Sequence, residues 1–188
     1  MISQIADRKN LFVKNLLISM SCEDPVKLAE KKASEYEMVY HGCAQATLLA
    51  LIEALNLPRD SAFRASTGLS GGMGLLGYVC GAFSGAVMAI GARFGRDFED
   101  FFQHDPAGKR LIVYRLVREY HKRFVEELGS CICKEIQERK YGRSFDLTDP
   151  KEYEEFVKAG AHSPSGCPEV CGKAARIAAE LILEAEKR

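Results

Sequence analysis

The stretch that most constrains the fold of this chain is GGMGLLGYVCGAFSGAVMAIG, residues 71–91, which holds seven glycines, one cysteine and no charged residue. It could be a phosphate-binding loop, a membrane span or a buried helix with a thiol. Gly72, Gly74 and Gly77 have the GxGxxG spacing of a dinucleotide loop, but no strand is recognisable before or after them. A helix from Gly77 has only about 15 residues before Arg93, whereas a bilayer needs about 20. We therefore expect a buried helix and no membrane span.

Helix-start and helix-stop signals punctuate the rest of the chain. Asp-Pro pairs at 24–25, 105–106 and 149–150 predict helix starts, as does Pro168, and Pro58 predicts a shorter helix to about Ser66. No segment alternates like a strand, and no repeat or linker marks a second domain. We predict one all-α domain over residues 1–188. It would be a compact helical bundle around a central, glycine-rich buried helix, with residues 1–25 as a peripheral N-terminal segment.

The expected glycine-rich helix has one face of small side chains. Interior glycine costs a helix about 1 kcal/mol relative to alanine, so the small face indicates close approach by another element. That element could come from the same chain or from a copy across a two-fold axis, and we expect a homodimer. The small face comprises Gly77, Cys80, Gly81, Ser84, Gly85 and Met88.

Composition excludes several classes of function. The 26 lysines and arginines balance 26 aspartates and glutamates, and no basic block appears, so we expect no nucleic-acid partner. Seven cysteines are an odd number in a mid-sized chain, which is not the pattern of a secreted disulfide framework. The segment before Cys22 lacks the small-residue cleavage pattern of a leader, and we expect a peripheral helix there. These observations favour a cytoplasmic location.

Four of the cysteines fall at predicted helix starts. Backbone N–H groups and the positive end of a helix dipole stabilise a thiolate, which lowers its pKa and makes it a better nucleophile and metal ligand. The four are separated by 37, 53 and 34 residues, without CxxC pairs, so their spacing alone does not show that they meet. Cys80 could equally be a small core residue at a helix crossing. The four residues are Cys43, Cys80, Cys133 and Cys167.

These residues resemble a known family. Gly42-Cys43-Ala44, CGAFSG from Cys80, Cys133 in GSCICKEI and Cys167 together resemble the C-GCAxxG-C-C family of redox-active proteins, over roughly residues 26–187. The resemblance extends to the non-haem domain of split-Soret cytochrome c. It implies that Cys43, Cys80, Cys133 and Cys167 hold an iron–sulfur centre. No CxxCH is present, so no covalent haem is implied.

The resemblance and the residues leave three functions open. The first is electron transfer to an unidentified redox partner protein through a [2Fe-2S] cluster on the four cysteines. The second is a metal-free thiol/disulfide cycle with Cys43 or Cys80 as the attacking thiolate. The third is structural metal binding or packing, although zinc sites usually have paired local ligands. Whether the chain is an enzyme stays open, as do the roles of the additional cysteines, Cys22, Cys131 and Cys171.

Other side chains carry weaker signals. His41, beside the Cys43 turn, and His162, in a loop near Cys167, could each be a ligand, a proton partner or a solvent-facing residue. His104 and His121 lie in charged surroundings and are predicted to be solvated. Acidic and basic residues follow helix-surface spacing, which does not favour paired-carboxylate catalysis.

Overall fold

The computed structural model describes residues 23–58 and 62–187 of the chain, and these residues fold into helices. Their only β pairing is an isolated antiparallel bridge between Val79 and Ile132. The predicted all-α class is confirmed, whereas the expected helix over residues 1–22, and Cys22 with it, lies outside the described residues. The elements are α2 (Pro25–Tyr40), α3 (Cys43–Leu55), α4 (Ala62–Ala65), the 3₁₀ helix η1 (Ser66–Leu69), α5 (Ser70–Met73), α6 (Gly81–Phe94), α7 (Phe98–Phe102), α8 (Lys109–Leu128), α9 (Cys133–Tyr141), α10 (Pro150–Lys158) and α11 (Cys167–Glu186).

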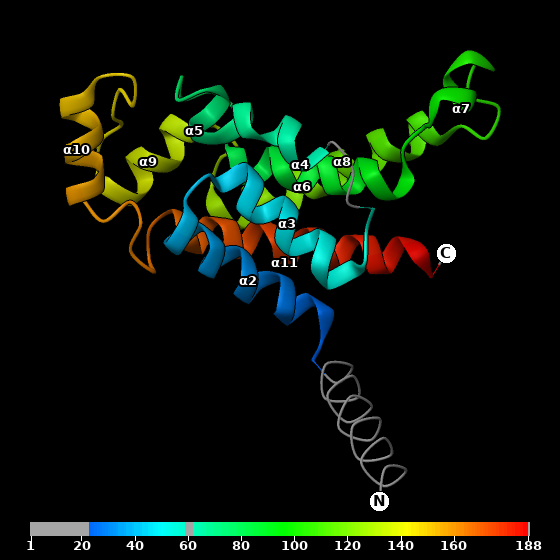
Figure 1. The fold of residues 1–188 in the computed structure, drawn as a ribbon, viewed down its shortest axis with the longest axis horizontal. Helices are drawn as coiled ribbons and strands as arrows, with labels where there is room; N and C mark the ends of the chain where they lie inside the picture. Colours follow the sequence, from blue (N-terminus) through cyan, green and yellow to red (C-terminus); the bar gives the residue numbers. More distant parts are fainter. Residues whose placement is uncertain (1–22, 59–61, 188) are drawn as a thin grey trace, which may run out of the picture.

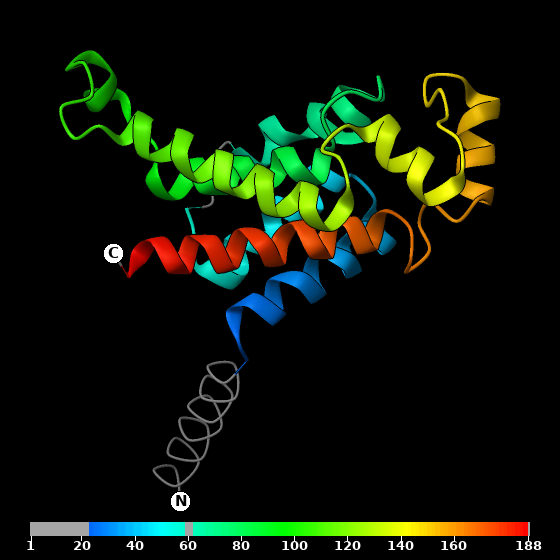
Figure 2. The ribbon, with the colours of Figure 1, turned by 180° about the vertical axis from the view of Figure 1, so that it is seen from behind.

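Helix α11 lies at the centre of the bundle. It packs against α2, α3, α6 and α8, and α3 also packs between α2 and α6 (Figures 1 and 2). Apolar side chains of α11 recur at helical spacing and are buried. They include Ala174, Ile177, Ala178, Leu181 and Ile182.

Side-chain caps set several of the helix starts. Asp24 accepts a hydrogen bond from Val26 N, and Asp149 accepts from Lys151 N and Glu152 N, so both predicted Asp-Pro starts are confirmed. The helix predicted after Asp105-Pro106 begins later, at Lys109, because Asp105 reaches forward to accept from Lys109 N and Arg110 N. The local capping motifs therefore predicted these helix starts to within a few residues.

The glycine-rich stretch differs from the prediction. Helix α6 begins at Gly81, not near Gly77. The short helix α5 and a loop precede it, and Gly71 and Gly72 of α5 and Gly74 and Gly77 of the loop all have positive φ. Gly77 is therefore not part of the helix face. That face still needs glycine, because a Cβ at Gly85 would collide with the Ala44 carbonyl of α3.

The close neighbour of α6 is thus α3 of the same chain. Because α3 already covers the small face of α6, that face gives no reason to expect a second copy of the chain. The homodimer remains a prediction.

Two short helices also differ from the prediction. The helix expected from Pro58 to Ser66 is α4, only Ala62–Ala65, and it continues as the 3₁₀ helix η1. Helix α7 was not predicted; a capping box between Asp97 and Asp100 begins it.

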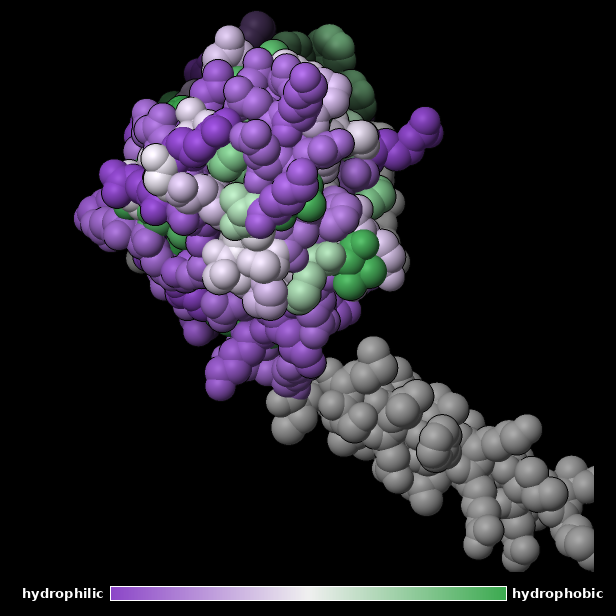
Figure 3. Space-filling view, turned by 90° about the vertical axis from the view of Figure 1, so that its left-hand side faces the viewer, coloured by the Kyte–Doolittle hydropathy of each residue, from purple (hydrophilic) through white to green (hydrophobic). Residues whose placement is uncertain are grey.

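A second, smaller hydrophobic cluster lies at the α9–α10 end of the molecule. It is formed by Phe145, Leu147, Phe156 and Ala161, with Cys167 packed against it. Viewed from this end, the surface is mainly hydrophilic, with few apolar side chains near its centre (Figure 3). None of the described helices is both long enough and apolar enough to cross a bilayer.

Candidate cysteine site

The four signature cysteines all lie at helix starts, as predicted. Cys43, Cys133 and Cys167 are the first residues of α3, α9 and α11, and Cys80 is the N-cap of α6. Cys167 is thus one residue inside its helix, because Gly166 takes the cap position.

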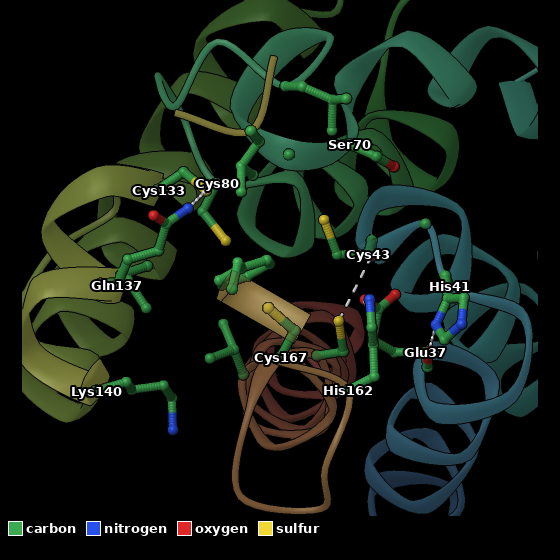
Figure 4. A pocket seen from close by; sticks show the side chains of 18 of the residues that line it. Glu37, His41, Cys43, Ser70, Cys80, Cys133, Gln137, Lys140, His162 and Cys167 are labelled. Atoms are coloured by element: carbon green, nitrogen blue, oxygen red, sulfur yellow. Dashed lines mark hydrogen bonds and ion pairs between the residues drawn. The ribbon is translucent and has the colours of Figure 1, made fainter. Parts of the chain in front are cut away.

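The same four cysteines line one cavity, and Cys171 lines it with them (Figure 4). The cavity has a volume of about 100 Å³, enough for several non-hydrogen atoms. All five cysteines are free thiols, and so is Cys131, which does not line this cavity. The remaining walls include Glu37, His41, Ser70, Gln137, Lys140, Tyr141 and His162.

A short tertiary pairing brings two of the cysteines together. Cys80 N donates to Cys131 O at 2.8 Å, and Cys133 N donates to Tyr78 O at 2.6 Å, on either side of the Val79–Ile132 bridge. The segment before α6 is therefore held against the segment before α9. Through its backbone, Cys131 helps to position Cys80 although its own side chain lies outside the cavity.

Glycine makes room for the third sulfur. A Cβ at Gly81 would collide with Cys43 Sγ and would also crowd Leu69 O and Ser70 Cα, each at 3.0 Å. Cys43 therefore points at the start of α6, beside Cys80. The Gly71 N–H and the Ser70 hydroxyl act to lower the pKa of Cys43, and the N–H groups of Ala82 and Phe83 act to lower that of Cys80.

Burial dominates the electrostatics of these thiols. Desolvation raises the pKa of Cys43 and of Cys80 to about 12 and that of Cys133 to about 11. A neighbouring cysteine adds to each shift, and Glu37 adds to those of Cys43 and Cys80. The pKa values of Cys167 and Cys171 are also raised well above the ordinary value, again mainly by burial. The expectation that helix starts lower these pKa values is wrong for the metal-free chain, because desolvation outweighs the backbone N–H groups.

Comparison with known proteins identifies the family. A family model described as "Putative redox-active protein (C_GCAxxG_C_C)" matches residues 41–181, which include all four signature cysteines. The chain belongs to this family. No curated protein and no solved structure matches significantly.

Three polar residues that line the cavity were not predicted from the sequence. Gln137 Nε2 donates to Cys133 Sγ at 3.4 Å, Lys140 Nζ donates to Glu169 Oε2 at 2.7 Å, and Tyr141 has a buried hydroxyl without a partner. They belong to α9, whose charged sequence resembles an ordinary exposed helix. Only their spacing from Cys133, at four, seven and eight residues, could have suggested a shared face.

The four histidines fall into two groups, one at the cavity wall and one on the exposed surface. His41 and His162 both contribute to the cavity wall, with ring centroids 3.8 Å apart, and buried Glu37 lies beside them. His104 and His121 are exposed, as predicted.

The spread of the sulfurs limits what the cysteines can hold. Ligands of a single tetrahedral zinc ion converge at about 2.3 Å from it, so their sulfurs lie close together. Within residues 23–58 and 62–187, the potential ligands that lie within 4.8 Å of one another as a set of three are those of Glu37, His41 and His162, not those of the cysteines. A group larger than one ion suits the cysteine arrangement better.

Proposed function

We propose that this member of the redox-active family is an electron carrier that binds a [2Fe-2S] cluster through Cys43, Cys80, Cys133 and Cys167. The observation that carries the proposal is that these four sulfurs, from four separate helix starts, line one buried cavity. Cysteine thiolates are the usual ligands of such clusters. When bound, the cluster would accept and release a single electron.

The chain's own groups would tune and protect such a site. The Gln137 amide donates to Cys133 Sγ, and the N–H groups of Gly71 in α5 and of Ala82 and Phe83 in α6 favour the thiolates of Cys43 and Cys80. Donors of this kind stabilise negative charge on the sulfurs and so influence the reduction potential. The apolar wall of Leu75, Ile136 and Val170 limits access of water.

The raised thiol pKa values weigh against the thiol/disulfide alternative. An attacking cysteine must be a thiolate, and at neutral pH a thiol with a pKa of about 12 is almost entirely protonated. Iron offsets that cost directly, because a coordinated thiol is deprotonated by the metal. Cys171, at the same cavity, is a candidate substitute ligand.

The decisive experiment is an anaerobic visible spectrum of the purified chain with iron, sulfide and zinc analysis. We expect charge-transfer absorption with iron and sulfide in equal amounts. Colourless, metal-free protein whose thiols titrate with an oxidant would instead establish the disulfide function.

Substitutions test the ligand set. Cys43→Ser and Cys80→Ser should each remove most of the cluster, and the double variant should add little, because ligands of one site act as a unit. Cys131→Ser and Cys22→Ser are the controls and should retain it. Full cluster content in both single variants at 43 and 80 would assign these thiols to core packing.

A further inference from the structure

We propose that Glu37, His41 and His162 bind a single divalent transition-metal ion at the wall of the cysteine cavity, separately from any group held by the cysteines. One ligand atom from each residue lies within 4.8 Å of the other two. In Figure 4 the three side chains stand together on the side of the cavity away from Cys133 and Gln137. This inference does not depend on the iron–sulfur proposal.

The strongest support is a buried charge that lacks a partner. Glu37 is only 3% exposed, and its Oε2 accepts no hydrogen bond from any residue within 23–58 and 62–187. Its Oε1 lies 3.7 Å from His162 Nδ1, which is longer than a hydrogen bond. A buried carboxylate is costly unless it is paired or coordinates a metal. No lysine or arginine of the described residues pairs with Glu37, so a bound cation would stabilise this group.

His162 shows the same deficiency. Both ring nitrogens, Nδ1 and Nε2, are buried, and neither has a hydrogen-bond partner in the part of the chain that the structure describes. A neutral imidazole always has one nitrogen with a free lone pair, which is the form that binds metals. Glu37 and His162, two potential metal ligands without hydrogen-bond partners among the described residues, therefore lie next to each other.

His41 is oriented in the way that metal-binding histidines usually are. Its Nδ1 lies 3.0 Å from Glu37 O, and because a carbonyl oxygen only accepts, Nδ1 must carry the proton. The lone pair is then on Nε2, and the backbone hydrogen bond fixes the ring, as second-shell contacts do in metal sites. His41 also has φ 60° and ψ 177°, a backbone conformation that is essentially restricted to glycine.

Two imidazoles and one carboxylate define the class of ion. This set suits zinc or ferrous iron rather than calcium or magnesium, which prefer oxygen ligands. Three protein ligands also leave a coordination position for water or another small ligand.

The first test measures zinc affinity and stoichiometry of the full chain as purified, by competition with a chromophoric chelator. We expect one zinc site whose affinity falls about 10- to 100-fold or more in Glu37→Gln and in His41→Asn. Exposed Glu35, on the same helix, and exposed His121 provide the matched controls Glu35→Gln and His121→Gln, which should bind like the wild type. His41 is exposed, and a non-glycine residue already occupies this backbone conformation, so His41→Asn adds no new steric demand and should still fold if Glu37→Gln does not.

The second test identifies the ligands with cobalt. In a Cys80→Ser background, Co²⁺ should give ligand-field absorption without thiolate-to-cobalt charge transfer, and His41→Asn should abolish it. Unchanged zinc affinity in His41→Asn would overturn the proposal. So would cobalt bound only with thiolate charge transfer, because the ion would then belong to the cysteines.

Discussion

Gln137 shows how one buried amide can connect the cysteine site to the fold. Its Nε2 donates to Cys133 Sγ, and its Oε1 accepts from Phe145 N at 2.8 Å. The side chain is 3% exposed, so water cannot replace either contact. The amide therefore contributes both to the electrostatics of the Cys133 sulfur and to the closure of the loop after α9.

Gln137→Leu should affect both roles. Loss of the acceptor for Phe145 N should lower the free energy of unfolding by about 1–3 kcal/mol, and loss of the donor to Cys133 should make the reduction potential more negative. Redox titration and denaturant unfolding measure the two effects. Glu138→Gln, at the exposed neighbouring position, is the control. An unchanged potential in Gln137→Leu would show that the amide does not influence the bound group.

Residue chemistry was partly predictable from sequence. Cysteines at helix starts are a local feature, and Cys43, Cys80, Cys133 and Cys167 could be identified without coordinates. Glu37 could not, because EYEMVYH is typical of an exposed helix end, and its burial and its place beside His162 arise from tertiary contacts. The raised pKa values of the thiols could not be predicted either, because desolvation depends on tertiary packing.

At the scale of elements, the crossing of α3 and α6 determines where Cys43 and Cys80 lie relative to each other. Gly85 allows the α6 backbone to lie against the Ala44 carbonyl, one residue after Cys43. By contrast, Gly91 on the same helix has open space around its Cα. The two glycines differ in environment while sharing one helix, and so they form a matched pair.

Gly85→Ala should therefore destabilise the protein by about 1–3 kcal/mol and reduce metal content, because the added methyl group pushes α3 and α6 apart. Gly91→Ala should be neutral or stabilising by up to about 1 kcal/mol, because alanine is the better helix former. Thermal unfolding and metal analysis of the two variants measure this difference. Equal effects would mean that the helices can separate without disturbing the site.

Elements were predictable where their signals are local. Asp24-Pro25 and Asp149-Pro150 gave correct helix starts because a side chain caps the N–H groups two or three residues away. The start of α6 was misplaced because the loop before it is fixed by pairing with Ile132, about fifty residues later. No helical periodicity encodes that contact.

At the scale of the whole molecule, the cavity concentrates five thiols, Cys43, Cys80, Cys133, Cys167 and Cys171, whose pKa values are all raised mainly by burial. In the unfolded chain these thiols ionise near their ordinary pKa, whereas in the folded metal-free chain they stay protonated to higher pH. The unfolded state then binds fewer protons, and the stability that the protonated thiols contribute is lost as pH rises.

We therefore expect the metal-free protein to lose stability from about pH 8 up to the folded-state pKa values of about 11 to about 12, by up to about 1.4 kcal/mol per pH unit for each buried thiol. Denaturant unfolding in the presence of a chelator, repeated across this range, measures the slope. Cys80→Ser removes one of the five thiols, so the difference in bound protons between the folded and unfolded states should fall by about one and the slope should become shallower. Cys131→Ser, whose thiol is outside the cavity, should change the slope less. Metal-loaded protein should lack this loss because its ligands are already deprotonated. A slope that Cys80→Ser leaves unchanged would show that the thiols do not titrate as one buried set.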